Sequence, residues 1–156
     1  MAESVYLGGV ADNRVVEVVK VESKWIDPTD KVCEVNGGEV KNGVCYAPWK
    51  EAKEICRVSE ARLPNVEELK KVVSNCGGKI FKLSDNNWEE VGNKNQNNNN
   101  YQKCYNSKGF INHDYWSSSS DTNNINNACI VDLEHGCTDY HSKSYSKYVR
   151  CVRTVQ

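Results

Sequence analysis

The sequence predicts a disulfide-stapled α+β domain, and three observations lead to this fold class. Two stretches with helical periodicity, residues 48–58 and 65–75, come before short stretches with the alternation of β-strands. Eight cysteines in 156 residues are a density typical of disulfide-bonded domains. The chain length itself fits one domain, residues 1–156.

Residues 1–46 are expected to form strands and a hairpin. The β-branched run from Arg14 to Lys20 favours a strand. Asn-Gly turn signals then separate Val32–Val35 from Val44–Tyr46, which is the pattern of a β-hairpin. A Cys33–Cys45 disulfide would staple this hairpin.

Two amphipathic helices follow. Pro48 stands at the first position of the first helix, where its missing N–H costs nothing. Asn65 and Glu68 have the spacing of a capping box at the start of the second helix. Each helix has one apolar stripe, formed by Trp49, Ala52, Ile55 and Cys56 in the first and by Val66, Leu69, Val72 and Val73 in the second. Trp49 and Cys56 are therefore interpreted as core residues.

The stretch from Gly77 to Asp114 is expected to be irregular. Ile80–Leu83 predicts a short strand, and Trp88 is expected to pack back into the core. The Asn-rich tract, residues 93–100, cannot bury apolar surface and is interpreted as a mobile loop tip. A Cys76–Cys104 disulfide would close the base of this region.

The C-terminal stretch predicts two strands, Ala128–Leu133 and Cys137–Tyr140, joined by a turn at His135-Gly136. Between the strand anchors nearly every side chain is polar or aromatic, so it makes hydrogen bonds but drives no core. We expect these side chains to form a recognition surface on an apolar frame of Trp116, Ile130, Leu133, Val149 and Val152.

The candidate ligand-binding residues combine rigid amphipathic contact area from Tyr and His with adaptable hydrogen bonding from Ser and Asn. Any one of them could equally well serve only to solubilise a sheet face, so the prediction concerns the set. The set is Asn123, Asn124, Asn126, Asn127, Asp132, Glu134, His135, Asp139, Tyr140, His141, Ser144, Tyr145 and Ser146.

Composition argues against several function classes. The net charge of −1 and the lack of an aromatic-interleaved basic stripe disfavour a nucleic-acid partner. No apolar run reaches the length of a membrane span, so membrane insertion is not expected. The closest cysteines, Cys129 and Cys137, are eight apart, which does not fit the spacing of zinc sites. No metal or other cofactor is expected.

Catalysis is not expected either. The cysteines are interpreted as disulfide-bonded, and the three histidines lack the context of hydrolase or metalloprotease motifs. His113 with Asp114 could form a proton-transfer pair, but a turn cap is the preferred interpretation.

The disulfides favour an oxidising destination, extracellular or at the cell surface. Because Met1-Ala2-Glu3 does not begin a signal peptide, we expect that a leader was removed and replaced by Met1.

Four blocks resemble the hallmarks of a known family. The first two are Pro48-Trp49-x-x-Ala52-x-x-x-Cys56 and Arg62-Leu63-Pro64-Asn65-x-Glu67-Glu68-Leu69. The other two are Tyr115-Trp116-Ser117-Ser118-Ser119 and Tyr148-Val149-Arg150-Cys151-Val152-Arg153. With this order, over about two-thirds of the chain, the sequence resembles the family of the Legionella collagen-like adhesin's C-terminal domain. Ala61 stands where that family usually has Trp, which concerns local packing.

The resemblance implies a variant of the C-type lectin fold, with residues 47–153 as the family-matching region. In that fold two helices pack on a twisted, mostly antiparallel sheet with long irregular loops. The resemblance also implies two further disulfides, Cys56–Cys151 and Cys129–Cys137.

The same fold and final blocks occur in the variable proteins of diversity-generating retroelements, whose mutagenesis turns Asn codons into Ser, Thr, Tyr, Asp and His codons. That composition is present at residues 121–127, 132–135 and 138–146. The resemblance therefore implies a module with a hypervariable surface that binds a protein or a cell-surface ligand such as a glycan.

The alternative is a glycan-binding adhesin domain of fixed specificity. A sulfated glycan would require a basic patch, for which the candidates are Lys143, Lys147, Arg150 and Arg153. The acidic sugar-binding motifs of calcium-dependent lectins are absent, so a calcium-dependent sugar site is disfavoured.

Overall fold

The computed structural model describes residues 2–6 and 18–155. Its helices are α1 (Asp30–Val35), α2 (Trp49–Val58), α3 (Val66–Asn75), α4 (Trp88–Gln96) and α5 (Asn99–Ser107). Its strands are β1 (Ala2–Tyr6), β2 (Val18–Ile26), β3 (Glu39–Lys41), β4 (Val44–Pro48), β5 (Phe81–Lys82), β6 (Asp114–Ser120), β7 (Asn127–Asp132), β8 (Cys137–Ser142), β9 (Ser146–Tyr148) and β10 (Cys151–Val155).

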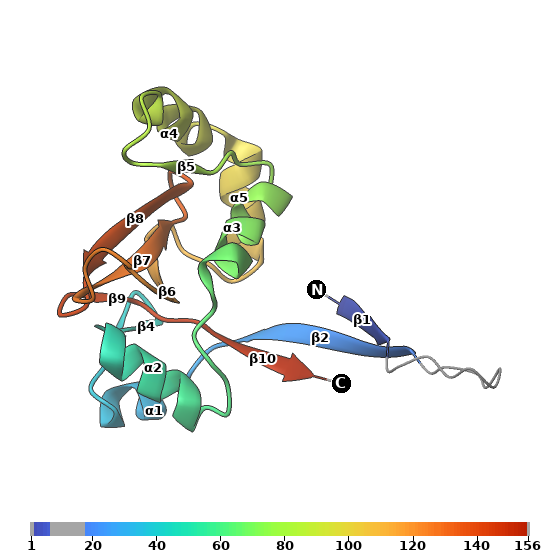
Figure 1. Cartoon of the computed structure of the whole chain (residues 1–156), viewed down its shortest axis with the longest axis vertical. Coiled ribbons are helices and arrows are strands. Elements are labelled where there is room, and N and C mark those ends of the chain that lie inside the picture. Colours follow the sequence, from blue (N-terminus) through green and yellow to red (C-terminus); the bar gives the residue numbers. More distant parts are fainter. Residues whose placement is uncertain (1, 7–17, 156) are drawn as a thin grey trace.

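The strands form two sheets. The larger has the order β3-β4-β9-β6-β7-β8-β5, and the smaller has the order β1-β2-β10. Pairing is antiparallel except between β6 and β9 and between β5 and β8. The smaller sheet extends away from the body of the molecule (Figure 1). The architecture is thus α+β with a mostly antiparallel sheet, as the sequence predicts.

Both faces of the larger sheet are covered by helices, and two neighbouring residues of β6 face opposite ways. Trp116 pairs with Ile130 of β7 and packs in a core with α2. Tyr115 pairs with Val131 and packs in a second core with α3 and α5. Because side chains alternate along a strand, the Tyr-Trp pair anchors both cores at once. The five residues expected to frame the C-terminal surface are all buried.

The two long amphipathic helices form where their periodicity predicts. In α2 the buried residues are Ala52, Ile55 and Cys56, and in α3 they are Leu69, Val72 and Val73. Asn65 and Glu68 form the expected capping box, in which each side chain bonds the other residue's backbone N–H at 2.9 Å. Ala61, which stands where the resembling family usually has Trp, is partly buried and packs against the core that contains Trp116.

The expected hairpin at residues 32–46 is wrong in its first half. Val32–Val35 is part of helix α1, because the Thr29 hydroxyl caps the Val32 N–H at 3.2 Å and outweighs the β-branched composition. The hairpin is β3–β4 instead, with Asn42-Gly43 as its turn, both at positive φ. Residues 14–17 of the expected N-terminal strand lie outside the described residues.

The Asn-rich tract is not a loop tip but lies in α4 and α5, so that expectation is wrong. Val91 and Asn95 of α4 are buried, as are Tyr101 and Tyr105 of α5. Beside Val91 and the two tyrosines, the buried amide of Asn95 bonds the backbone of Lys79 and His135, which composition alone cannot reveal. Trp88 is 46% exposed at the start of α4, so its expected place in the core is also wrong.

Three of the four expected disulfides form, namely Cys33–Cys45, Cys56–Cys151 and Cys76–Cys104. The fourth expectation is wrong, since Cys129 and Cys137 are free and buried. Cys137 lies opposite Asp132, three positions from Cys129, which places the thiols on opposite faces of the sheet. That offset is about 10 Å along the strand, beyond the roughly 7 Å that a disulfide spans. Burial raises the pKa of the Cys129 thiol to about 11, so it stays protonated and unreactive.

Candidate ligand-binding surface

The β7–β8 hairpin divides the predicted binding residues between its two ends. Asn127 pairs with Ser142 at one end, and Asp132 pairs with Cys137 at the other. Five residue steps separate these ends, a distance of about 17 Å. We name residues 121–127 and 140–146 the loop surface. It contains nine of the thirteen predicted residues, namely Asn123, Asn124, Asn126, Asn127, Tyr140, His141, Ser144, Tyr145 and Ser146.

The first part of the loop surface is built by local side-chain caps. The Asp121 carboxylate accepts the Asn123 N–H at 2.9 Å, and the Asn124 amide oxygen accepts the Asn126 N–H at 3.0 Å. The Asp121 N–H donates to the carbonyl of Asn127 at 3.0 Å and closes the loop. Asx turns of this kind explain why an Asn-rich stretch adopts one conformation here.

Lys143 joins the two parts of the loop surface to helix α2. Its backbone N–H donates to the Asn126 carbonyl at 2.8 Å, and its ammonium donates to the Ile125 carbonyl at 2.6 Å. The ammonium also lies 4.2 Å from the ring centroid of Trp49, whose backbone N–H donates to the Lys143 carbonyl. Trp49 is only partly buried, so it supports the loops as well as the core. Sequence reasoning missed this contact because no periodicity links Trp49 to Lys143.

Three large apolar or aromatic side chains are exposed on the loop surface. Ile125 is 78% exposed, Tyr145 is 63% exposed and Tyr140 is 49% exposed. Exposed apolar groups rimmed by amides and hydroxyls are the composition of protein contact sites. Ile125 was not among the predicted residues. The signal that could have found it is an apolar residue alone within a run of Asn.

Asp139 and His141 form a pair on one face of β8. The His141 Nε2 lies 3.0 Å from the Asp139 carboxylate, and both side chains are about one-third exposed. Tyr140, between them in the strand, points to the opposite face. The pair therefore lies on the face of β8 opposite Tyr140, and of the two residues only His141 belongs to the loop surface.

Asp132, Glu134 and His135 gather at the β7–β8 turn, away from the loop surface. The Asp132 carboxylate accepts the Glu134 N–H and lies 2.8 Å from His135 Nδ1. Burial raises the pKa of Asp132. Directly opposite lies Asp114, whose charge is balanced by the Lys147 ammonium at 3.0 Å. A small cavity of about 180 Å³ adjoins these groups. Their contacts stabilise the turn.

The four candidate cations do not form one basic patch. Lys143 is bound to Trp49 and Ile125, and Lys147 to Asp114. Arg150 is 6% exposed and donates to Asp27 at 2.7 Å. Arg153 donates to the carbonyls of Ser59 and Glu60. Each cation has a structural partner on a different element.

A comparison of the sequence with family profiles assigns the chain to a known family. The profile of the Lcl (Legionella collagen-like) C-terminal domain matches residues 21–153. The chain belongs to the Lcl C-terminal domain family. The matched range includes α2, α3, the loop surface and all three disulfides of this Lcl C-terminal domain. No curated protein matches the chain.

Membership indicates an adhesin-like C-terminal domain. The three disulfides are consistent with a secreted or surface-displayed Lcl C-terminal domain. In the part of the chain that the structure describes, no helix has the length and apolarity to cross a membrane. The likeness to the C-type lectin fold stays a prediction.

Proposed function

We propose that this domain is a binding module of an extracellular or surface-displayed protein, and that its loop surface contacts a protein or cell-surface ligand without catalysis. The observation that carries the proposal is the exposure of Ile125 and Tyr145 on loops held by Lys143 and Trp49, with Tyr140 exposed on the adjoining strand β8. Exposed rings give contact area, and the surrounding amides and hydroxyls give hydrogen bonds.

Preorganisation supports this assignment. The Asx turns and the Lys143 contacts hold the loops before a ligand arrives. A surface that is already ordered loses less conformational entropy on binding. The two parts of the loop surface come from different connections, β6–β7 and β8–β9, so the ligand would contact both together.

We further propose that the loop surface is diversified, as in variable proteins of diversity-generating retroelements. Most of its side chains are exposed or half-buried, whereas Val149 and Val152 are buried in the frame. Substitution would therefore change binding while it leaves the core intact. Sequencing the encoding locus in several clones tests this: variable codons within residues 121–146 support it, and fixed codons favour one specificity.

The binding assignment is tested with variants of exposed apolar residues. Ile125→Ser and Tyr145→Ser each remove one contact group from the loop surface, and we expect about tenfold weaker binding from each. Val35→Ser is the matched control, because Val35 is 74% exposed at the end of α1. The readout is binding of the labelled domain to arrays of glycans and extracellular-matrix proteins, then titration with the best target.

An equal loss of binding in Val35→Ser would contradict the assignment to the loop surface. A glycan as the best target would favour the adhesin alternative. Because the candidate cations are dispersed among structural partners, we expect a neutral glycan or a protein rather than a sulfated glycan.

A further inference from the structure

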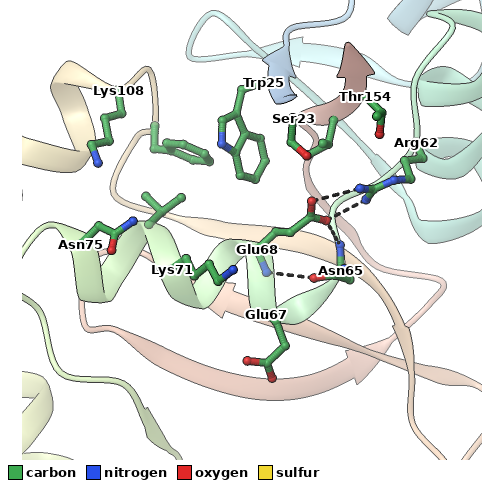
Figure 2. A pocket seen from close by; sticks show the side chains of 13 residues that line it. Ser23, Trp25, Arg62, Asn65, Glu67, Glu68, Lys71, Asn75, Lys108 and Thr154 are labelled. Carbon is green, nitrogen blue, oxygen red and sulfur yellow. Dashed lines mark hydrogen bonds and ion pairs between the residues drawn. The ribbon is translucent and has the colours of Figure 1, made fainter. Parts of the chain in front are cut away.

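A groove lies on another part of the molecule than the loop surface, between α3 and the strands β2 and β10. It is a half-open groove of about 740 Å³. Figure 2 shows side chains from both sides converging on it, with Trp25 on one wall and Lys71 of α3 on the other. None of the thirteen predicted binding residues lines this groove. Its volume is within the range of small-molecule sites.

The groove has an aromatic wall. Trp25 of β2 and Phe110 lie edge to face, with their ring centroids 4.9 Å apart and an interplanar angle of 84°. Phe110 is 1% exposed, whereas Trp25 is only partly buried and lines the open space. Val72 and Val152, both buried, complete the apolar lining. A planar apolar group would find area to stack on here.

One end of the groove is electrically balanced. Arg62 holds the Glu68 carboxylate with two hydrogen bonds of 2.7 and 3.0 Å, and Figure 2 shows this pair beside Asn65. Burial alone would raise the pKa of Glu68, but the bonds from Arg62 and from the Asn65 N–H outweigh it and lower the pKa. Glu67, also on the lining, pairs with Lys70 at 3.2 Å.

The other end carries the Lys108 ammonium, which has no carboxylate partner among the described residues. Lys108, the C-cap residue of α5, lies there beside Asn75, with Lys71 one turn earlier along α3 (Figure 2). Arg150 lies 4.6 Å from the Phe110 ring centroid, and its charge is balanced by Asp27. Lys108 is therefore the cation that a bound anion would meet.

We propose that this groove binds a small ligand with a planar apolar ring and one acidic group, a carboxylate or a sulfonate. The ring stacks on Trp25, and the acidic group lies at the Lys108 end. The site is independent of the loop surface, so it adds a second ligand to the binding function proposed above.

A matched pair of fluorescent probes tests the proposal on the whole chain. 8-Anilinonaphthalene-1-sulfonate has the ring and the acid, whereas N-phenyl-1-naphthylamine has the same ring system without the acid. We expect Lys108→Glu to weaken binding of the sulfonate probe about tenfold. Binding of the neutral probe should change by less than about twofold. Lys103→Glu is the control, because it makes the same charge change on α5 outside the groove.

The position of the bound probe is read by NMR from the indole N–H signals of the tryptophans. Trp→Phe variants assign each signal to its residue. We expect the sulfonate probe to shift the Trp25 signal. The signal of Trp88, the exposed tryptophan of α4, should stay unchanged. Equal weakening by the Lys103 and Lys108 variants would overturn the proposal, as would a shift confined to Trp88. Ile125→Ser should not change probe binding, so failure here is distinguishable from failure of the loop-surface function.

Discussion

Asn95 shows how a single polar residue can hold a fold together. Its side chain is 4% exposed, and its amide donates to the carbonyls of Lys79 and His135 at 2.8 Å each. Its amide oxygen accepts the Lys79 N–H at 3.0 Å. Gly136 approaches so closely that a Cβ there would lie 2.5 Å from the Asn95 amide nitrogen. One residue of the Asn-rich tract therefore fixes the β7–β8 turn.

Replacing Asn95 by Ala is expected to lower the free energy of unfolding by about 2–3 kcal/mol, since backbone groups of Lys79 and His135 lose their partners. Asn93→Ala, at an exposed position of the same helix, is the control and should change it by less than about 0.5 kcal/mol. Denaturant unfolding measures both. Equal losses in the two variants would mean that the buried amide of Asn95 is not the cause, because Ala has a higher helix propensity than Asn at both positions.

At the scale of an element, α3 depends on Glu68 twice. This carboxylate completes the capping box at the N-terminus of α3 and also binds Arg62, whose backbone bridges Val152 of β10. The helix, the segment before it and the smaller sheet are thus joined at one side chain. The same carboxylate balances one end of the groove.

Glu68→Gln should keep the cap but remove the charge pair, because either side chain can accept the Asn65 N–H. The pKa of Glu68 is lowered in the folded state, so its contribution is present above the ordinary value of 4.5 and is lost as pH falls below it. We expect the variant to be less stable by about 0.5–1 kcal/mol at neutral pH and to converge with wild type in acid.

Unfolding free energies measured from pH 3 to pH 7 test this expectation. Glu67→Gln is the control, because its carboxylate is 71% exposed and pairs with Lys70 of the same helix. Parallel curves for wild type and the Glu68 variant would contradict the assigned role.

At the scale of the whole molecule, the Cys56–Cys151 disulfide ties α2 to β10 across a separation of 95 residues. Both cysteines are fully buried in the core that contains Trp116. The bond therefore links the body of the molecule to the smaller sheet. That sheet also meets the body through the Arg62–Val152 bridge, the Arg153 contact with Ser59 and the packing of Trp25 on Phe110.

Replacing Cys56 and Cys151 together by Ala is expected to lower stability by about 5 kcal/mol through loop-closure entropy alone. The Cys33–Cys45 bond has a separation of only 12 and is buried in the same core, so its removal should cost about 3 kcal/mol. Unfolding midpoints of the two double variants, compared with wild type, give the difference. The opposite order would show that strain or packing, not chain entropy, decides.

Much of the scaffold could be predicted because its signals are local. The stripes of α2 and α3, the capping box at Asn65 and the β7–β8 alternation each depend on residues within a few positions of one another. Nine residues of the loop surface were named in the same way from composition, and their binding role stays a prediction. The contact between Trp49 and Lys143 that supports this surface could not be predicted, because the two residues are 94 positions apart and meet only in the folded chain.

The sequence by itself determined the fold class, the two amphipathic helices, the polar C-terminal stretch and the family. Periodicity, caps and hallmark blocks are properties of neighbouring residues. Only the tertiary structure decided that the Asn-rich tract is helical and buries Asn95, that Val32–Val35 is helical, and that Cys129 and Cys137 stay apart. Those outcomes depend on strand register and on contacts between distant segments, because a buried amide or thiol is placed by the partners that surround it.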